Sequence, residues 1–149
     1  MKFGTLRNVV KWTGLVLVLI CLFLITWFSL AKGPEMPFSF NDMDKFEHFL
    51  GYAGFSFSLT LMCIGFNKRF TGDNLTIKKL AKCSLVPILI SLIYGVAIEF
   101  IQPHFGRAFE LMDMVADFCG AIFGSLICLV CVVFVCKTVF QVAKDTNRQ

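Results

Sequence analysis

The sequence predicts an all-α integral membrane protein, a four-helix bundle that forms a single domain over residues 1–149. Hydrophobic residues make up 57% of the chain and charged residues 16%, against roughly 45–50% and about 25% in soluble proteins. With 18 Phe and a mean hydropathy of +0.76, so short a chain has more apolar surface than one core can bury. The composition argues against disorder, and the scattered charges behind the net +4 argue against nucleic-acid binding.

Four predominantly apolar stretches are long enough to cross a hydrocarbon core of ~30 Å, which needs ~20 helical residues. We place these spans at residues 9–31, 46–66, 80–101 and 114–135. In the first span, Trp12 and Trp27 lie towards opposite ends, where interfacial aromatic residues are common. Ser29-Leu30-Ala31 resembles a signal-peptide cleavage site, but the apolar run before it exceeds the usual ~7–15 residues, which favours a retained span.

The second and third spans carry ionisable residues at their ends, which indicates function. The second begins beside Glu47 and His48, and the third ends at Glu99. The fourth span contains Gly120-x-x-x-Gly124, a small-residue face suited to close helix packing. The seven cysteines fall in or beside the spans, and we assign them neither disulfides nor a metal.

The distribution of basic residues predicts the orientation. All but three of the 14 Lys and Arg lie in the N-terminus, the second loop and the C-terminal tail, the exceptions being Lys32, Lys45 and Arg107. Because cytoplasmic segments are enriched in Lys and Arg, both termini are expected in the cytoplasm. The chain is expected to cross its membrane an even number of times.

Polar residues converge on the outer ends of the predicted helices. They are Asp44, Lys45, His48 and Tyr52 at the start of the second span, Glu99 and Gln102 at the end of the third, Arg107 in the outer loop, and Asp113 and Asp117 at the start of the fourth. Lys82 precedes Glu99 by 17 residues, about 25 Å of helix. This depth predicts a site at the level of lipid head groups, not a transporter site at the midplane.

Structural explanations also exist for several of these residues. Asp44 and Asp113 suit helix N-termini, and Lys45 and Arg107 can neutralise acidic neighbours or bind lipid phosphates. His48 and Tyr52 can be interfacial side chains, whereas Glu99 and Asp117 lie within apolar helix and are hard to explain without a function.

Several of these residues form an ordered series that resembles the VanZ-like family. The series is Asp44-Lys45-x-x-His48-x-x-x-Tyr52, Tyr94-Gly95-x-x-x-Glu99-x-x-Gln102, Arg107, Asp113 and Gly120-x-x-x-Gly124. Asp117 departs from the pattern, which often has Asn at that position. The resemblance implies a small, multi-pass bacterial inner-membrane protein of the cell envelope, of the kind linked to teicoplanin resistance. Related folds have been proposed to act on lipid or lipid-carrier head groups.

The leading hypothesis is an outer-interface site that binds, and hydrolyses or transfers, the head group of a phosphate-bearing lipid or polyprenyl-linked precursor. Arg107 and Lys45 would hold the phosphate, with Asp44, Tyr52 and Gln102 beside it. His48 and Glu99 are the acid and base candidates. No metal ligand is assigned, although Asp113 and Asp117 suit either orienting His48 or binding a divalent cation with Glu99.

Two other functions remain open from the sequence. In the first, the chain is no enzyme: its polar residues lock the helix ends together while the protein masks a precursor or docks a partner. The second is a proton-coupled carrier, which the lack of charge at mid-depth disfavours.

Overall fold

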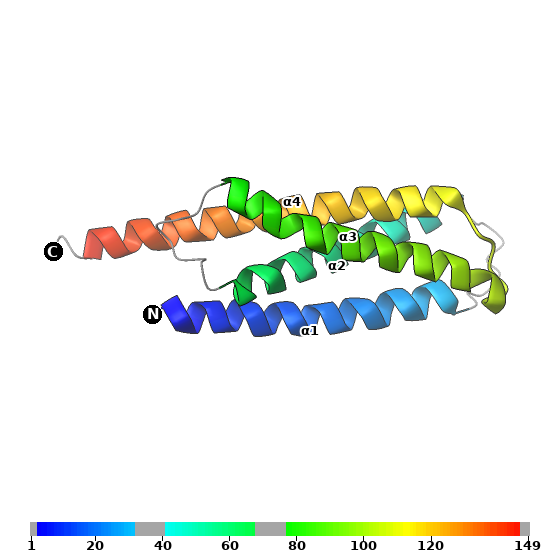
Figure 1. Ribbon diagram of the computed structural model, residues 1–149, viewed down its shortest axis with the longest axis horizontal. Helices are drawn as coiled ribbons and strands as arrows, with labels where there is room; N and C mark the ends of the chain where they lie inside the picture. Colours follow the sequence, from blue (N-terminus) through cyan, green and yellow to red (C-terminus); the bar gives the residue numbers. More distant parts are fainter. Residues whose placement is uncertain (1–2, 32–40, 68–76, 147–149) are drawn as a thin grey trace.

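The computed structural model describes residues 3–31, 41–67 and 77–146. Its elements are the long helices α1 (Phe3–Leu30), α2 (Asn41–Phe66), α3 (Ile77–Ile101) and α4 (Leu111–Thr146), and a short 3-10 helix, η2 (Gln102–Phe105). The long helices run along a common axis, and no strand occurs in the described ranges (Figure 1). The predicted all-α bundle is confirmed.

Each long helix provides a stretch long and apolar enough to cross a membrane, and the third stretch continues from α3 into η2. The stretches are Arg7–Leu30, Met43–Phe66, Ala81–Phe105 and Leu111–Val135. Large apolar side chains such as Phe23, Leu85 and Phe134 are more than 60% exposed on the bundle surface, as lipid-facing side chains are. The described part of the chain therefore provides four membrane spans, and the protein is an integral, multi-pass membrane protein.

The helices are longer than the predicted spans. Helix α2 begins at Asn41 instead of residue 46, and α4 extends from Leu111 to Thr146 instead of over 114–135. The reason is that acidic side chains stabilise the first turns of a helix. The acidic residues that precede the apolar stretches in the sequence therefore belong to the helices. Asp113 is one of them, in the first turn of α4.

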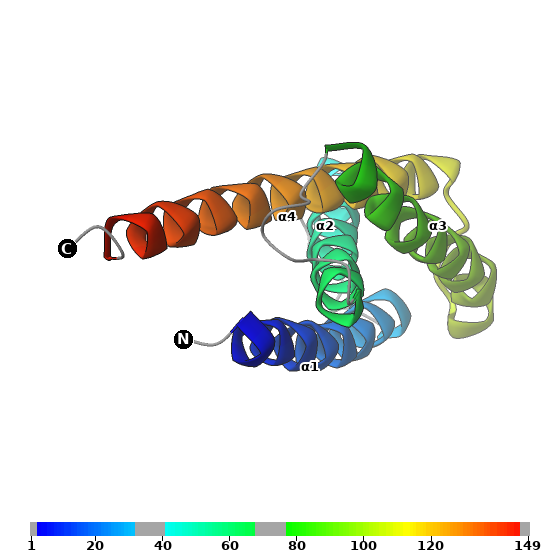
Figure 2. The same ribbon diagram turned by 60° about the vertical axis from the view of Figure 1, so that its left-hand side comes forward.

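Helix α2 is the centre of the bundle. It packs against α4, α1 and α3, whereas α1 has few contacts with α3 and packs mainly on α2 (Figure 2). A Cβ on Gly124 would collide with the carbonyl oxygen of Ala53, and one on Gly120 with that of Phe49. The backbones of α2 and α4 are therefore in direct contact.

A tight turn joins α3 to α4. Gly106 follows η2 with φ of 81°, the one positive φ among the described residues, and this conformation suits glycine. The N–H of Arg107 then donates to the carbonyl oxygen of Gln102 at 3.2 Å. This turn brings Arg107 back towards α1 and α2.

Candidate functional site

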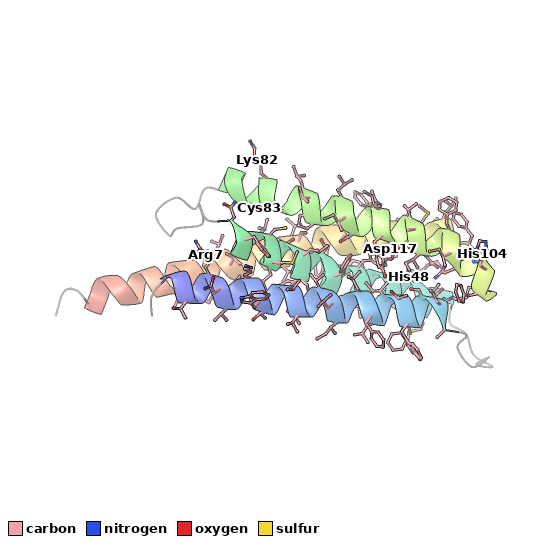
Figure 3. All side chains as sticks on the ribbon, turned by 60° about the horizontal axis from the view of Figure 1, so that its bottom comes forward. Arg7, His48, Lys82, Cys83, His104 and Asp117 are labelled. Atoms are coloured by element: carbon pink, nitrogen blue, oxygen red, sulfur yellow. The ribbon has the colours of Figure 1, made fainter. Side chains whose placement is uncertain are left out.

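We call the end of the bundle where α1 and α3 finish and α2 and α4 begin the polar end. His48, Asp117 and His104 lie towards it, and Arg7 and Lys82 lie towards the other end (Figure 3). The predicted site residues that are buried here, none more than 6% exposed, are His48, Tyr52, Glu99, Gln102, Asp113 and Asp117. The structure thus brings together side chains that come from separate helices.

His48 on α2 is held by two carboxylates of α4. Its Nδ1 lies 2.9 Å from Oδ1 of Asp117, and its Nε2 lies 3.8 Å from Oδ2 of Asp113. An ionised carboxylate only accepts hydrogen bonds, so Nδ1 carries the hydrogen and, in the neutral ring, Nε2 keeps a lone pair. Gly95 on α3 makes room for this pair, because a Cβ there would lie 2.6 Å from Oδ2 of Asp117.

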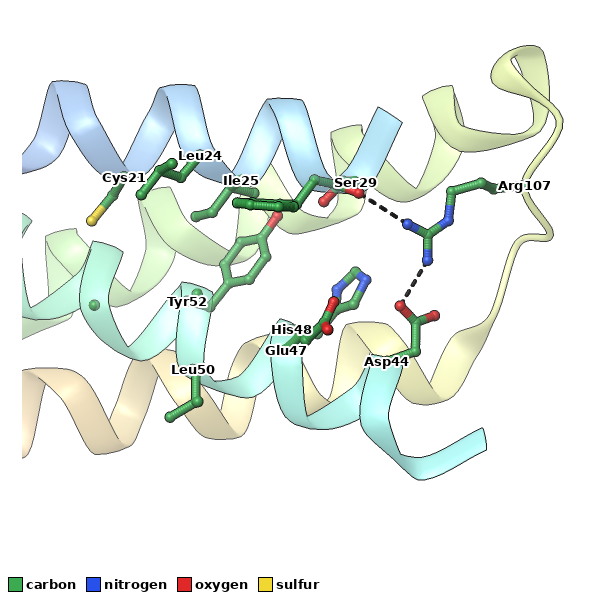
Figure 4. Close-up of a pocket in the computed structure, with 13 residues that line it drawn as sticks. Cys21, Leu24, Ile25, Ser29, Asp44, Glu47, His48, Leu50, Tyr52 and Arg107 are labelled. Atoms are coloured by element: carbon green, nitrogen blue, oxygen red, sulfur yellow. Dashed lines mark hydrogen bonds and ion pairs between the residues drawn. The ribbon is translucent and has the colours of Figure 1, made fainter. Parts of the chain in front are cut away.

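Arg107 connects the loop to two helices. One guanidinium nitrogen donates to Oδ1 of Asp44 at 2.7 Å, and another donates to the carbonyl oxygen of Phe28 at 3.1 Å (Figure 4). Lys45 forms a more exposed ion pair with Glu110, 3.3 Å from Nζ to Oε2. Both basic side chains therefore pair with acidic neighbours, as expected if they neutralise those acids.

Glu99 and Gln102 fix the end of α3. Oε1 of Glu99 accepts the N–H of Glu110 at 2.6 Å. With its nitrogen turned to this carboxylate, the amide of Gln102 donates to Oε2 at 2.9 Å. These two contacts tether the end of α3. Glu99 does not line the cavity described next, and its acid–base role stays a prediction.

A cavity of about 490 Å³ lies between α1 and α2. Its walls are mainly apolar. Asp44, His48 and Arg107 line the part of the cavity that lies at the polar end of the bundle (Figure 4). The other lining residues are Cys21, Leu24, Ile25, Phe28, Ser29, Glu47, Leu50, Gly51, Tyr52 and Gly54. Leu24 and Phe28 are 42% and 63% exposed on the bundle surface, so the cavity borders the surface that faces lipid.

Several buried oxygens at the polar end lack a hydrogen-bond partner among the residues that the structure describes. They are the hydroxyl of Tyr52, Oδ1 of Asp113 and Oδ2 of Asp117. Buried polar groups are nearly always partnered in native proteins. Asp44, His48 and Asp113 also offer one ligand atom each within 4.8 Å of one another, a set that could hold a metal ion.

The α1 wall of the cavity was not predictable. Ile25 and Cys21 are apolar residues in a helix that is apolar nearly all round, so no periodic signal marks the face that lines a site. In the sequence Glu47 marks only the start of the second apolar span, whereas in the structure it lines the cavity. Tyr52 is 1% exposed and stacks on His48, with ring centroids 6.4 Å apart, so it is not an interfacial residue.

Comparison with protein-family models, with curated proteins and with solved structures finds no match to this chain.

Proposed function

We propose that this protein binds the head group of a phosphate-bearing lipid or polyprenyl-linked precursor and hydrolyses or transfers it. The cavity between α1 and α2 carries this proposal, because it combines apolar walls at the lipid-facing surface with a charged end at Asp44, His48 and Arg107. An amphiphile has the same division between chain and head group.

The cavity has a suitable size. Its volume of about 490 Å³ falls within the ~300–1,000 Å³ of small-molecule sites. That space accommodates a head group and the first part of an acyl or prenyl chain. The remainder of the chain would stay in the bilayer beside Leu24 and Phe28, which are exposed there.

The polar end offers groups for both binding and chemistry. Arg107 uses two donors on Asp44 and Phe28, and a guanidinium has five, so donors remain for a phosphate. The lone pair on Nε2 of His48 can accept a proton or bind a cation, and Asp117 holds the ring in one orientation. Hydrolysis or transfer of the head group is the reaction class that these groups serve.

We further propose that the polar end faces the outside of a bacterial inner membrane, with both termini in the cytoplasm. The concentration of Lys and Arg at the opposite end supports this orientation. In this setting the protein would act on the cell envelope, as the resemblance to VanZ-like proteins implies. A role in glycopeptide resistance of the teicoplanin type belongs to the same proposal.

A non-enzymatic role is the second candidate, and specific contacts favour it. Arg107, Lys45 and Glu99 each join two parts of the polar end and thereby lock the helix ends together. In that role the protein would mask a precursor or dock a partner, and its cavity would carry out no reaction.

The test compares lipids and polyprenyl-linked precursors by mass spectrometry in bacterial membranes that contain wild type or His48→Gln at equal abundance. His104→Gln is the matched control, because His104 is exposed in η2 and does not line the cavity. We expect a head-group species to appear or disappear with wild type and with the control, but not with His48→Gln. Identical profiles for all of them, with every protein folded, would favour the non-enzymatic role.

A further inference from the structure

We infer that Asp44, His48 and Asp113 form a binding site for a first-row divalent cation, Zn²⁺ or Mn²⁺, at the polar end of the cavity. Asp117 acts as a positioning residue that orients His48. The binding of the cation stands on the geometry of these residues, and only its use in holding a phosphate rests on the proposed function.

The distances suit a shared ion. One ligand atom from each residue lies within 4.8 Å of the others. Two ligands bound at ~2.1 Å to one ion lie up to ~4.2 Å apart, so small side-chain rotations complete the set. The 3.8 Å between Nε2 of His48 and Oδ2 of Asp113 is too long for a hydrogen bond and fits two atoms that bind the same ion.

His48 is already oriented as a metal ligand. A metal-bound histidine typically donates its other ring N–H to a carboxylate, which fixes the tautomer and the ring plane. The 2.9 Å bond from Nδ1 to Oδ1 of Asp117 is this arrangement, and it directs the Nε2 lone pair towards Asp113.

Asp113 provides an independent indication. Its side chain is about 2% exposed, and its Oδ1 has no hydrogen-bond partner among the described residues. Burying a carboxylate without a compensating cation is unfavourable. The basic group that Asp113 contacts is His48, at 3.8 Å, and His48 also faces Asp117.

The charge balance at the polar end points the same way. Among the described side chains, Arg107 and Lys45 are the permanent cations here. Arg107 pairs with Asp44 and Lys45 with Glu110, whereas the same end of the bundle holds further carboxyl groups, namely Glu47, Glu99, Asp113 and Asp117. An anionic head group would be repelled from such a site unless a cation were bound.

The donor set selects the metal. Mg²⁺ and Ca²⁺ prefer oxygen ligands only, whereas one imidazole with two carboxylates suits Zn²⁺ or Mn²⁺, and this set of three contains no cysteine for softer ions. Asp44 and His48 line the cavity, so the remaining coordination positions face the space proposed for the head group. A phosphate oxygen or a water molecule can occupy them.

The test titrates Mn²⁺ into the purified, chelator-treated full-length protein in detergent, followed by electron paramagnetic resonance and elemental analysis. We expect one ion per chain, displaced by Zn²⁺, and loss of binding in Asp113→Asn and in Asp44→Asn. Asp117→Asn should weaken binding about 10–100-fold with the fold intact, as loss of a histidine-orienting partner does. Glu110→Gln removes an exposed carboxylate at the same end and should bind Mn²⁺ like wild type.

Absence of Mn²⁺ and Zn²⁺ binding, or equal binding by wild type and both ligand variants, would overturn the inference. Asp44 is partly exposed, so Asp44→Asn tests the site even if Asp113→Asn does not fold. Metal binding without any wild-type-dependent lipid change would retain the metal site and reject the proposed function. A lipid change that persists in folded Asp44→Asn protein without bound metal would retain the proposed function and reject the use of the cation in holding the phosphate.

Discussion

At the scale of the residue, the polar end depends on how three helices surround His48. The ring is fixed by Asp117, stacks on Tyr52 and faces Asp113, while Gly95 leaves the space that Asp117 occupies. Each contact constrains the same ring, so one neutral tautomer and one orientation are favoured. A single reactive nitrogen therefore faces the polar end of the cavity.

Arg107 gives a direct prediction at this scale. Its planar guanidinium reaches Asp44 and the carbonyl of Phe28 at once, and a lysine cannot reproduce this fork. Arg107→Lys should lower the free energy of unfolding by about 1 kcal/mol, a modest value because both side chains are partly exposed. Unfolding in detergent measures it.

Arg7→Lys at the opposite end is the matched control, and we expect little change there. A cycle that combines Arg107→Gln with Asp44→Asn isolates the ion pair, because each substitution removes one of its two charges. If the two substitutions were fully additive, Arg107 and Asp44 would not be coupled and the contact would not secure the loop.

The ionisable part of the site was predictable from sequence for a physical reason. A charged residue in an apolar helix is costly, so His48, Glu99 and Asp117 are conspicuous there. The sequence does not show which of them face the cavity. Glu99 is directed to the N–H of Glu110, a contact that depends on the path of the loop.

At the scale of the element, α2 and α4 form the rigid part of the bundle. Their backbones meet at Gly120 and Gly124, and the next residue, Ser125, forms hydrogen bonds with Ser56 at 2.7 Å and with Thr60 at 2.9 Å. Small residues and interhelical hydrogen bonds are the usual means of association within lipid. This contact holds His48 beside the carboxylates of α4.

Gly124→Ala tests this contact. The added Cβ would meet the carbonyl oxygen of Ala53, which is backbone and cannot move away cheaply. We expect the free energy of unfolding to fall by about 1–3 kcal/mol, the usual cost of overpacking. Gly4→Ala is the control, because nothing lies within 4 Å of a Cβ there. Equal stabilities of the two variants would mean that α2 and α4 are not in close contact.

The number of helices and the small-residue face were readable from sequence, but the helix pairing was not. All four helices are apolar nearly all round, so a hydrophobic pattern cannot show which faces meet. Gly120-x-x-x-Gly124 indicates that a close partner exists without saying that it is α2. The partner depends on which surfaces are complementary in three dimensions.

At the scale of the whole molecule, the bundle is asymmetric in a way that creates the cavity. Helices α2, α3 and α4 pack together, whereas α1 packs mainly on α2. The space between α1 and α2 borders the lipid-facing surface and ends at Arg107, whose two bonds bridge the same pair of helices. A lipid could enter from the bilayer without crossing the bundle.

The most direct test of the central claim, that this cavity holds a lipid head group, is native mass spectrometry of lipids that co-purify with Gly54→Leu. Gly54 lines the cavity, and a Cβ there makes only ordinary contact with Sγ of Cys21 at 3.8 Å, so the longer side chain fills the space between the helices. Gly4→Leu adds the same side chain in open space. We predict that wild type and Gly4→Leu retain a phosphate-bearing lipid and that Gly54→Leu retains about tenfold less, the equivalent of ~1.4 kcal/mol. Equal lipid retention by all three proteins would contradict the account.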